Sequence, residues 1–221
     1  MELMDTASSG LFITLEGGEG CGKSTQASLL GEALTNLNMK VVVTREPGGA
    51  PGAEIIRKLL VEGELDRWDG LTETLLHTAA RRNHLVNTVW PAMSLGTVVI
   101  CDRFFDSTLA YQGYGHGIDL DKIRAIHSAS IGNFAPALTF IFDMPVETAF
   151  QRINSRAGTE LRYENMNLEF HERVRQGFLD TASSKPNRYK VINASREASA
   201  IHLDVLSIVL GILKNQERGY E

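Results

Sequence analysis

The sequence predicts an α/β fold built on a five-stranded parallel sheet with helices on both faces. Three observations predict it: short apolar runs that suit buried strands, apolar residues at helical spacing between these runs, and polar residues directly after several of them. Strands that alternate with helices pair in parallel, so their polar ends gather along one edge of the sheet. The 221 residues suit a single domain, because no repeat, linker or change of composition divides the chain.

The first predicted strand, 11–15, opens into a glycine-rich turn with the pattern G-x-x-x-x-G-K-[ST]. This pattern is a P-loop, whose glycines let backbone N–H groups curl around phosphate oxygens. The helix predicted over 24–37 adds the positive end of its dipole. We expect Lys23 to reach the β- and γ-phosphates of ATP and Ser24 to ligate Mg²⁺. The predicted ATP-binding residues are Gly17, Gly18, Glu19, Gly20, Cys21, Gly22, Lys23, Ser24 and Thr25.

The second predicted strand, 40–44, ends in a turn of strong structure breakers, REPGG at 45–49. Helical spacing returns over 53–62. A longer helical stretch runs over 71–93, and Pro91 marks its last turn.

The third predicted strand, 97–101, is apolar throughout, as suits a strand that helices cover on both faces. It is followed by Asp102 and Arg103, which we expect at the ligand-binding edge of the sheet. The remaining expected elements are a helix over 107–111, a loop at 113–117, a helix over 119–131, a strand over 137–142 that Asp143 ends, a helix from Pro145, a mobile loop at 154–167, a helix over 168–182, a strand over 189–192, a helix over 198–213 and a frayed polar tail.

Composition excludes several classes of protein. A net charge of −5 argues against a nucleic-acid-binding scaffold, which needs a basic face. The N-terminus is acidic rather than basic and then apolar, and no apolar run reaches the roughly eighteen residues of a membrane span. We therefore expect a cytoplasmic protein with no membrane or nucleic-acid partner. Cys21 and Cys101 form neither a metal-binding pattern nor a disulfide framework, and we expect both to be small buried fillers.

Three segments together resemble the bacterial thymidylate kinases: GGEGCGKST in the P-loop, TREPGG after the second strand, and DRFFDSTLAYQG after the third. The resemblance continues through LLHTAARR and covers residues 12–178. It implies a P-loop nucleoside monophosphate kinase-like fold and transfer of the γ-phosphoryl group of ATP to dTMP, with Mg²⁺, to give dTDP for dTTP synthesis. It also implies a homodimer and a lid at 154–167 that carries arginines.

The resemblance assigns substrate-binding roles residue by residue. Glu19 matches the carboxylate that accepts a hydrogen bond from the 3′-hydroxyl of dTMP. Arg57 and Arg103 match arginines that face its phosphate, a pairing that suits the planar guanidinium. Arg81 matches the arginine that reads the thymine carbonyl. The other expected members of the substrate pocket are His77, Ser107, Thr108, Tyr111 and Gln112.

This chain departs from the family pattern at three positions. His77 stands where the family usually stacks a phenylalanine on thymine, and Leu161 stands where an aspartate commonly precedes the lid arginine. Gly20 stands where eukaryotic-type members place an arginine. The chain in this respect resembles the bacterial subgroup, in which lid arginines, here Arg156 and Arg162, supply the missing positive charge.

The chemistry of phosphoryl transfer agrees with this residue set. The acceptor phosphate monoester is already largely dianionic at neutral pH, so the reaction needs positioning and charge stabilisation rather than a general base. The predicted catalytic residues are Lys23, Arg103, Arg156 and Arg162. Asp102 is expected to join Ser24 at Mg²⁺ or to orient Arg103. Closure of the lid would exclude water.

Other interpretations remain open from sequence alone. One is a kinase that acts on another monophosphate or on a nucleoside. Another is a P-loop switch or partition ATPase, although no guanine-reading N-K-x-D motif is present. A carboxylate after a strand can also cap a helix, which we expect for Asp143 but not for Asp102. His77 could be a hydrogen-bonded core residue, and the lid arginines could merely solubilise a loop.

Overall fold

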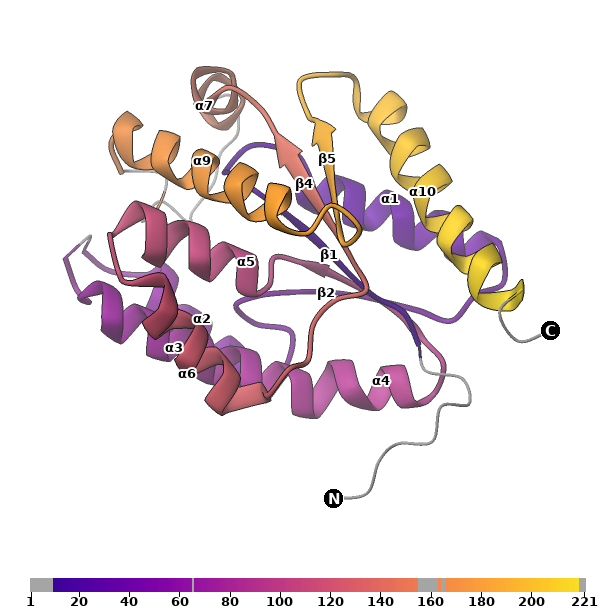
Figure 1. Cartoon of the computed structure of the whole chain (residues 1–221), viewed down its shortest axis with the longest axis horizontal. Coiled ribbons are helices and arrows are strands. Elements are labelled where there is room, and N and C mark those ends of the chain that lie inside the picture. The colour runs from indigo at the N-terminus through magenta and orange to yellow at the C-terminus, as the bar shows by residue number, and fades with distance from the viewer. Residues whose placement is uncertain (1–9, 65, 155–162, 164–165, 219–221) are drawn as a thin grey trace.

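A five-stranded parallel sheet in the order β2-β3-β1-β4-β5 forms the centre of the molecule in the computed structural model, which describes residues 10–64, 66–154, 163 and 166–218 (Figure 1). This confirms the predicted sheet and adds the strand order. The strands are β1 (Phe12–Gly17), β2 (Val41–Arg45), β3 (Val98–Asp102), β4 (Leu138–Asp143) and β5 (Tyr189–Asn193).

Helices cover both faces of the sheet, as predicted (Figure 1). The α-helices are α1 (Lys23–Asn36), α2 (Pro51–Val61), α3 (Gly70–His84), α4 (Trp90–Ser94), α5 (Phe105–Thr108), α6 (Leu120–Ile131), α7 (Val146–Asn154), α9 (Leu168–Ser184) and α10 (Ala198–Arg218). None of these described helices combines the length and hydropathy that a membrane crossing requires.

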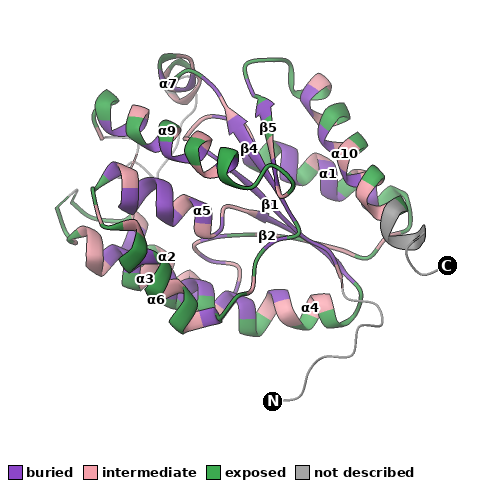
Figure 2. Cartoon of the chain, viewed as in Figure 1, coloured by how far each residue is buried: buried purple, intermediate pink, exposed green. Residues whose placement is uncertain are grey.

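Side chains alternate between the two faces of the strands, and each set enters a different core. The residues of β1 and β4 are mostly buried (Figure 2). Ile13 and Ile100 pack with α1 and α10, whereas Phe12 and Val99 pack with the segment that follows α3. On the same side as Phe12, Ile141 packs against α9. Burial on both faces explains why the strands are apolar at successive positions.

Two π-helical segments extend α-helices; one lies within a helix that the sequence predicted, and the other corrects a predicted loop. The segment η1 (Leu85–Val89) joins α3 to α4, so the predicted helix 71–93 is one helical path with a widened turn just before Pro91. The segment η2 (Leu109–Gly115) continues α5, where the sequence predicted a loop from Gly113. The glycines there misled the prediction, because the backbone N–H of His116 still bonds the carbonyl of Tyr111, five residues earlier, at 2.9 Å.

Candidate nucleotide-binding site

A cleft of about 450 Å³ opens at the carboxyl ends of β1, β2 and β3, where the topology of a parallel sheet predicts a ligand site. Predicted site residues from distant parts of the chain line it: Glu19, Gly20, Gly22, Lys23, Ser24, Thr25, Arg57, His77, Arg81, Asp102, Arg103, Ser107, Thr108, Tyr111 and Gln112. Gly18 and Cys21 instead line a second cavity of about 20 Å³. The carbonyl of Gly17 contacts Arg103 at 2.8 Å.

The P-loop has the backbone that phosphate binding requires. Gly22 has a φ of 84°, and α1 begins at the next residue with no side chain of the described residues capping it. At Gly17, a Cβ would lie 2.5 Å from the carbonyl oxygen of Phe142, so only glycine fits there. Lys23 is buried, and its ammonium group donates to the carbonyl of Gly18 at 2.6 Å. The loop therefore holds its lysine inside the turn of the motif.

Ser24 and Asp102 meet where α1 and β3 approach each other. The hydroxyl of Ser24 donates to Oδ2 of Asp102. The other carboxylate oxygen, Oδ1, is buried and has no hydrogen-bond partner among the described residues. Mg²⁺ prefers oxygen ligands and one or two carboxylates beside substrate phosphates. The pair therefore fits the predicted magnesium site.

Arg103 connects the P-loop with the opposite wall of the cleft. Its φ is 70°, a left-handed conformation that is uncommon for arginine. Its guanidinium donates to the carbonyl of Gly17 at 2.8 Å, to Ser107 at 3.0 Å and to the hydroxyl of Tyr111 at 3.1 Å. It also pairs with the carboxylate of Glu19 at 2.7 Å. Residues predicted to contact different groups of dTMP thus lie side by side.

Glu19 is a carboxylate that stays ionised inside the cleft. Burial alone would raise its pKa, but the charges of Arg103 and Lys23 and the hydrogen bond from Tyr111 lower the pKa to about 2. An ionised acceptor beside the P-loop suits a ligand hydroxyl group.

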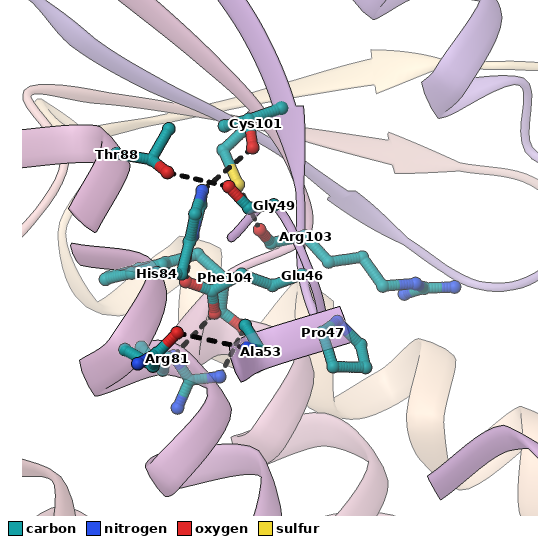
Figure 3. A network of polar contacts seen from close by, with 12 residues as sticks. Glu46, Pro47, Gly49, Ala53, Arg81, His84, Thr88, Cys101, Arg103 and Phe104 are labelled. Carbon is teal, nitrogen blue, oxygen red and sulfur yellow. Dashed lines mark hydrogen bonds and ion pairs between the residues drawn. The ribbon is translucent and has the colours of Figure 1, made fainter. Parts of the chain in front are cut away.

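Arg81 is a buried residue that lines the cleft, and it belongs to a network of polar contacts (Figure 3). Its Nε donates to Glu46 at 2.8 Å, and its Nη2 donates to Thr108 at 2.9 Å and to the carbonyl of Phe104 at 3.2 Å. Its Nη1 is buried and has no hydrogen-bond partner within the described part of the chain. Since arginine has five N–H donors, two remain there for a ligand.

His77, Gln112 and Tyr163 meet beside Arg81. The hydroxyl of Tyr163 lies 3.3 Å from Nε2 of His77 and 3.4 Å from Nε2 of Gln112. Arg57, on α2, donates to the carbonyl of Pro47 at 2.6 Å. The two predicted lid arginines, Arg156 and Arg162, lie outside the described residues, as does Leu161.

The structure also identifies residues to which sequence reasoning gave no role. Glu16, in β1, is buried and accepts hydrogen bonds from the backbone of Phe104 at 2.8 Å and from Ser107 at 2.6 Å. Burial, and then the charge of Asp106, raises the pKa of Glu16 to about 7. A lone acidic residue just before the P-loop glycines was the signal available in the sequence.

Two other sequence expectations can be compared with the structure. Asp143 does not stand alone at the end of β4, because it forms a two-point ion pair with Arg175 of α9 at 2.7 and 3.1 Å. This is a structural role, as predicted, though through an ion pair between elements. Cys21 and Cys101 are buried, as predicted, and burial raises the pKa of both thiols.

Comparisons with known proteins agree with the fold. A family model described as thymidylate kinase matches residues 15–205. Thymidylate kinases of Ruegeria pomeroyi and Caulobacter vibrioides are 49% and 47% identical over 201 residues, which cover 91% of this chain and 95% and 96% of theirs. The crystal structure of thymidylate kinase from Ehrlichia chaffeensis aligns with a TM-score of 0.73 at 38% identity, over 91% of this chain and 99% of that one. This chain therefore belongs to the thymidylate kinase family.

Proposed function

We propose that this chain transfers the γ-phosphoryl group of ATP to dTMP and so produces dTDP. Family membership supports this activity. The observation that carries it is that Lys23, Arg81 and Arg103 line a single cleft, in which Arg103 contacts both the P-loop carbonyl of Gly17 and the hydroxyl of Tyr111. A donor triphosphate and an acceptor monophosphate can meet there with their phosphates close to Arg103.

ATP binds at the P-loop in this proposal. The backbone N–H groups before α1 and the ammonium of Lys23 hold the β- and γ-phosphates. Ser24 and Asp102 are the residues that would hold Mg²⁺, which neutralises phosphate charge when bound. The lysine gives up its bond to the carbonyl of Gly18 in exchange for phosphate oxygens.

The acceptor dTMP occupies the other end of the cleft. Glu19 accepts the 3′-hydroxyl, and Arg57 and Arg103 face the phosphate. The free donors on Nη1 of Arg81 suit the carbonyl at position 4 of thymine or uracil. Cytosine presents an amino group at the same position, which cannot accept a hydrogen bond. Selection of a thymine or uracil base over cytosine follows from this donor alone.

Catalysis in this proposal rests on charge and position. Arg103 stabilises the charge that spreads over the oxygens of the transferring group, and no residue has to remove a proton from a phosphate that is already ionised. The buried carboxylate Glu16 holds the hydroxyl of Ser107, which is one of the contacts that orient Arg103. Arg156 and Arg162 act as lid arginines by resemblance to the family.

We also propose that residues 1–221 act as one kinase domain with a lid at 154–167, and that the chain forms a homodimer, as family resemblance implies. Light scattering coupled to size-exclusion chromatography measures the oligomeric state directly. A mass near 24.3 kDa at working enzyme concentrations would contradict the dimer.

The activity is tested by the rate of ADP formation from ATP and Mg²⁺ with dTMP, dUMP, dCMP, dGMP or no acceptor at one fixed concentration. Strong stimulation by dTMP supports the proposal, and Lys23→Ala serves as the inactive control. Equal stimulation by all acceptors, or by none, contradicts it. ATP hydrolysis that only a protein partner accelerates would favour a switch or partition ATPase.

A further inference from the structure

The turn TREPGG lies beside the cleft, and phosphate binding does not account for most of its side chains. It begins in the last two residues of β2, and its residues reach across to α3 (Figure 3). The structure shows that this turn forms a buried chain of hydrogen bonds that ends on Arg81.

Glu46 is the centre of this chain of hydrogen bonds. One of its oxygens accepts from Nε of Arg81 at 2.8 Å, and the other contacts Nδ1 of His84 at 2.9 Å. All three side chains are at least 96% buried. Because Glu46 lies in a loop and its two partners lie one helical turn apart on α3, a single carboxylate sets the position of both.

His84 extends the chain to the sheet. A carboxylate only accepts hydrogen bonds, so Nδ1 of His84 carries a proton. The other ring nitrogen, Nε2, lies 2.8 Å from the hydroxyl of Thr44 in β2. Arg81 is thus connected through Glu46 and His84 to a side chain of the sheet.

Gly49 packs tightly against the hydrogen-bonded side chains of His84 and Thr44. Its φ is 77°, and a Cβ there would lie 2.3 Å from the hydroxyl of Thr44 and 2.6 Å from Nε2 of His84. The carbonyl of Gly49 accepts from Thr88 at 2.7 Å, which fastens the turn to the helical segment after α3. The second glycine of the motif is therefore needed for the contact between His84 and Thr44.

Glu46 and His84, together with Cys101, form a poor metal site. Potential ligand atoms of Glu46, His84 and Cys101 lie within 4.8 Å of one another. Both oxygens of Glu46 and both ring nitrogens of His84 already have hydrogen-bond partners, and the thiol of Cys101 donates to the carbonyl of Arg103 at 3.0 Å. The positive charge of the Arg81 guanidinium, which is paired with Glu46, would also repel a metal cation bound there. Hydrogen bonding between side chains is the role that fits.

We propose that Glu46 and His84 are positioning residues for base recognition. They hold the guanidinium of Arg81 by Nε, while Thr108 and Phe104 hold Nη2, so that Nη1 faces the base in one fixed orientation. This inference rests on the proposed function, because it assumes that Arg81 reads the base. Loss of either residue should weaken dTMP binding and base selection and leave phosphoryl transfer from bound substrate nearly unchanged.

A double-mutant cycle between Glu46→Gln and Arg81→Ala tests the proposal. Glu46→Gln alone should raise KM for dTMP about tenfold or more and lower the preference for dTMP over dCMP, with kcat and KM for ATP within about threefold of wild type. In the Arg81→Ala background the same change should alter KM less than twofold. Equal effects in both backgrounds, or an unchanged KM in the single variant, would overturn the proposal.

Two variants of His84 decide the matter if Glu46→Gln does not fold. Gln supplies both an N–H donor group and a carbonyl acceptor, so it can replace the donor and the acceptor of the imidazole, whereas Leu supplies neither. His84→Gln should therefore retain much of the base preference that His84→Leu loses, and equal preferences would overturn the proposal. Asp204→Asn, which removes an exposed ion pair with Arg196 on the surface, is the matched carboxylate-to-amide control.

The failure of this inference differs from a failure of the proposed function. If wild-type protein does not phosphorylate dTMP, the proposed function is wrong and the inference falls with it. If wild-type protein is active and the cycle is additive, only the role of Glu46 and His84 is wrong. Thermal denaturation of every variant shows which of them fold.

Discussion

The carboxylate of Glu19 and the guanidinium of Arg103 lie 2.7 Å apart, although 84 positions separate them in the sequence. The two residues follow adjacent strands, β1 and β3, so the parallel sheet alone brings them together. Their pairing keeps both groups charged inside the cleft, since burial opposes the charge on each.

Replacement of Arg103 by Ala should lower kcat at least about 100-fold, because the variant lacks the cation that faces the transferring group. Steady-state kinetics with dTMP and ATP measure this, and circular dichroism should show an intact fold. Arg124→Ala is the control, since Arg124 is an exposed α6 residue paired with Asp121. Activity of Arg103→Ala within threefold of wild type would remove Arg103 from the mechanism.

Glu16→Gln should stabilise the protein relative to wild type as pH rises. The pKa of Glu16 is raised from 4.5 to about 7 in the folded protein, so the folded state binds more protons than the unfolded state between these values. The contribution of Glu16 to stability is therefore complete below about pH 4.5 and is lost as pH rises to about 7. The amide of Gln can still accept from Phe104 and donate to Ser107.

Urea denaturation at several pH values from 5 to 8 measures this effect as the free energy of unfolding of both proteins. The free energy of unfolding of the variant should rise relative to wild type up to about pH 7, and the difference should level off above it. A constant difference across this range would show that Glu16 does not titrate there.

Asp102→Asn should raise the Mg²⁺ concentration for half-maximal activity about tenfold or more, because it removes the charge of the expected carboxylate ligand. Asp143→Asn is the matched control, because Asp143 also ends a strand but pairs with Arg175. This control should keep the wild-type Mg²⁺ dependence and lose about 1 kcal/mol of stability. Identical Mg²⁺ titrations for the two variants would contradict the assignment of Asp102.

His77→Ala should raise KM for dTMP about tenfold, since an aromatic surface that stacks on a base contributes about 1–3 kcal/mol. His77→Phe should restore KM to the wild-type value or below it, because phenylalanine offers a larger apolar face. Initial rates at varied dTMP concentrations measure both. If the Ala and Phe variants share the same KM, His77 does not stack on the base and belongs to the polar contacts around Tyr163.

The sequence predicted the class of fold because strand and helix periodicities are local. It also predicted part of the lining of the cleft, since Lys23, Asp102 and Arg103 come after predicted strands that a parallel sheet aligns, whereas Arg57, His77 and Arg81 were expected there from the family resemblance. It did not predict the order of the strands, which depends on packing between segments far apart in the chain.

The sequence did not predict the hydrogen-bonding roles of Glu46 and Glu16, for related reasons. Glu46 lies among turn residues, and its role depends on Arg81 and His84, which are 35 and 38 positions away. Glu16 directly follows the predicted strand 11–15, and only the fold brings Ser107 to it. Long-range polar contacts of this kind have no periodic pattern in a sequence.

The π-helical segment η2 limits how the gene for this chain can change. A π-turn holds one more residue than an α-turn, so deletion of a single codon within 109–115 could be absorbed as a regular α-helix. That repair would leave the residues on either side in register and would turn only the side chains within the segment. Tyr111 and Gln112 lie in this segment and face the cleft. Substitutions here can be tested by selection one at a time, whereas a change of length would remove two pocket residues from their places at once.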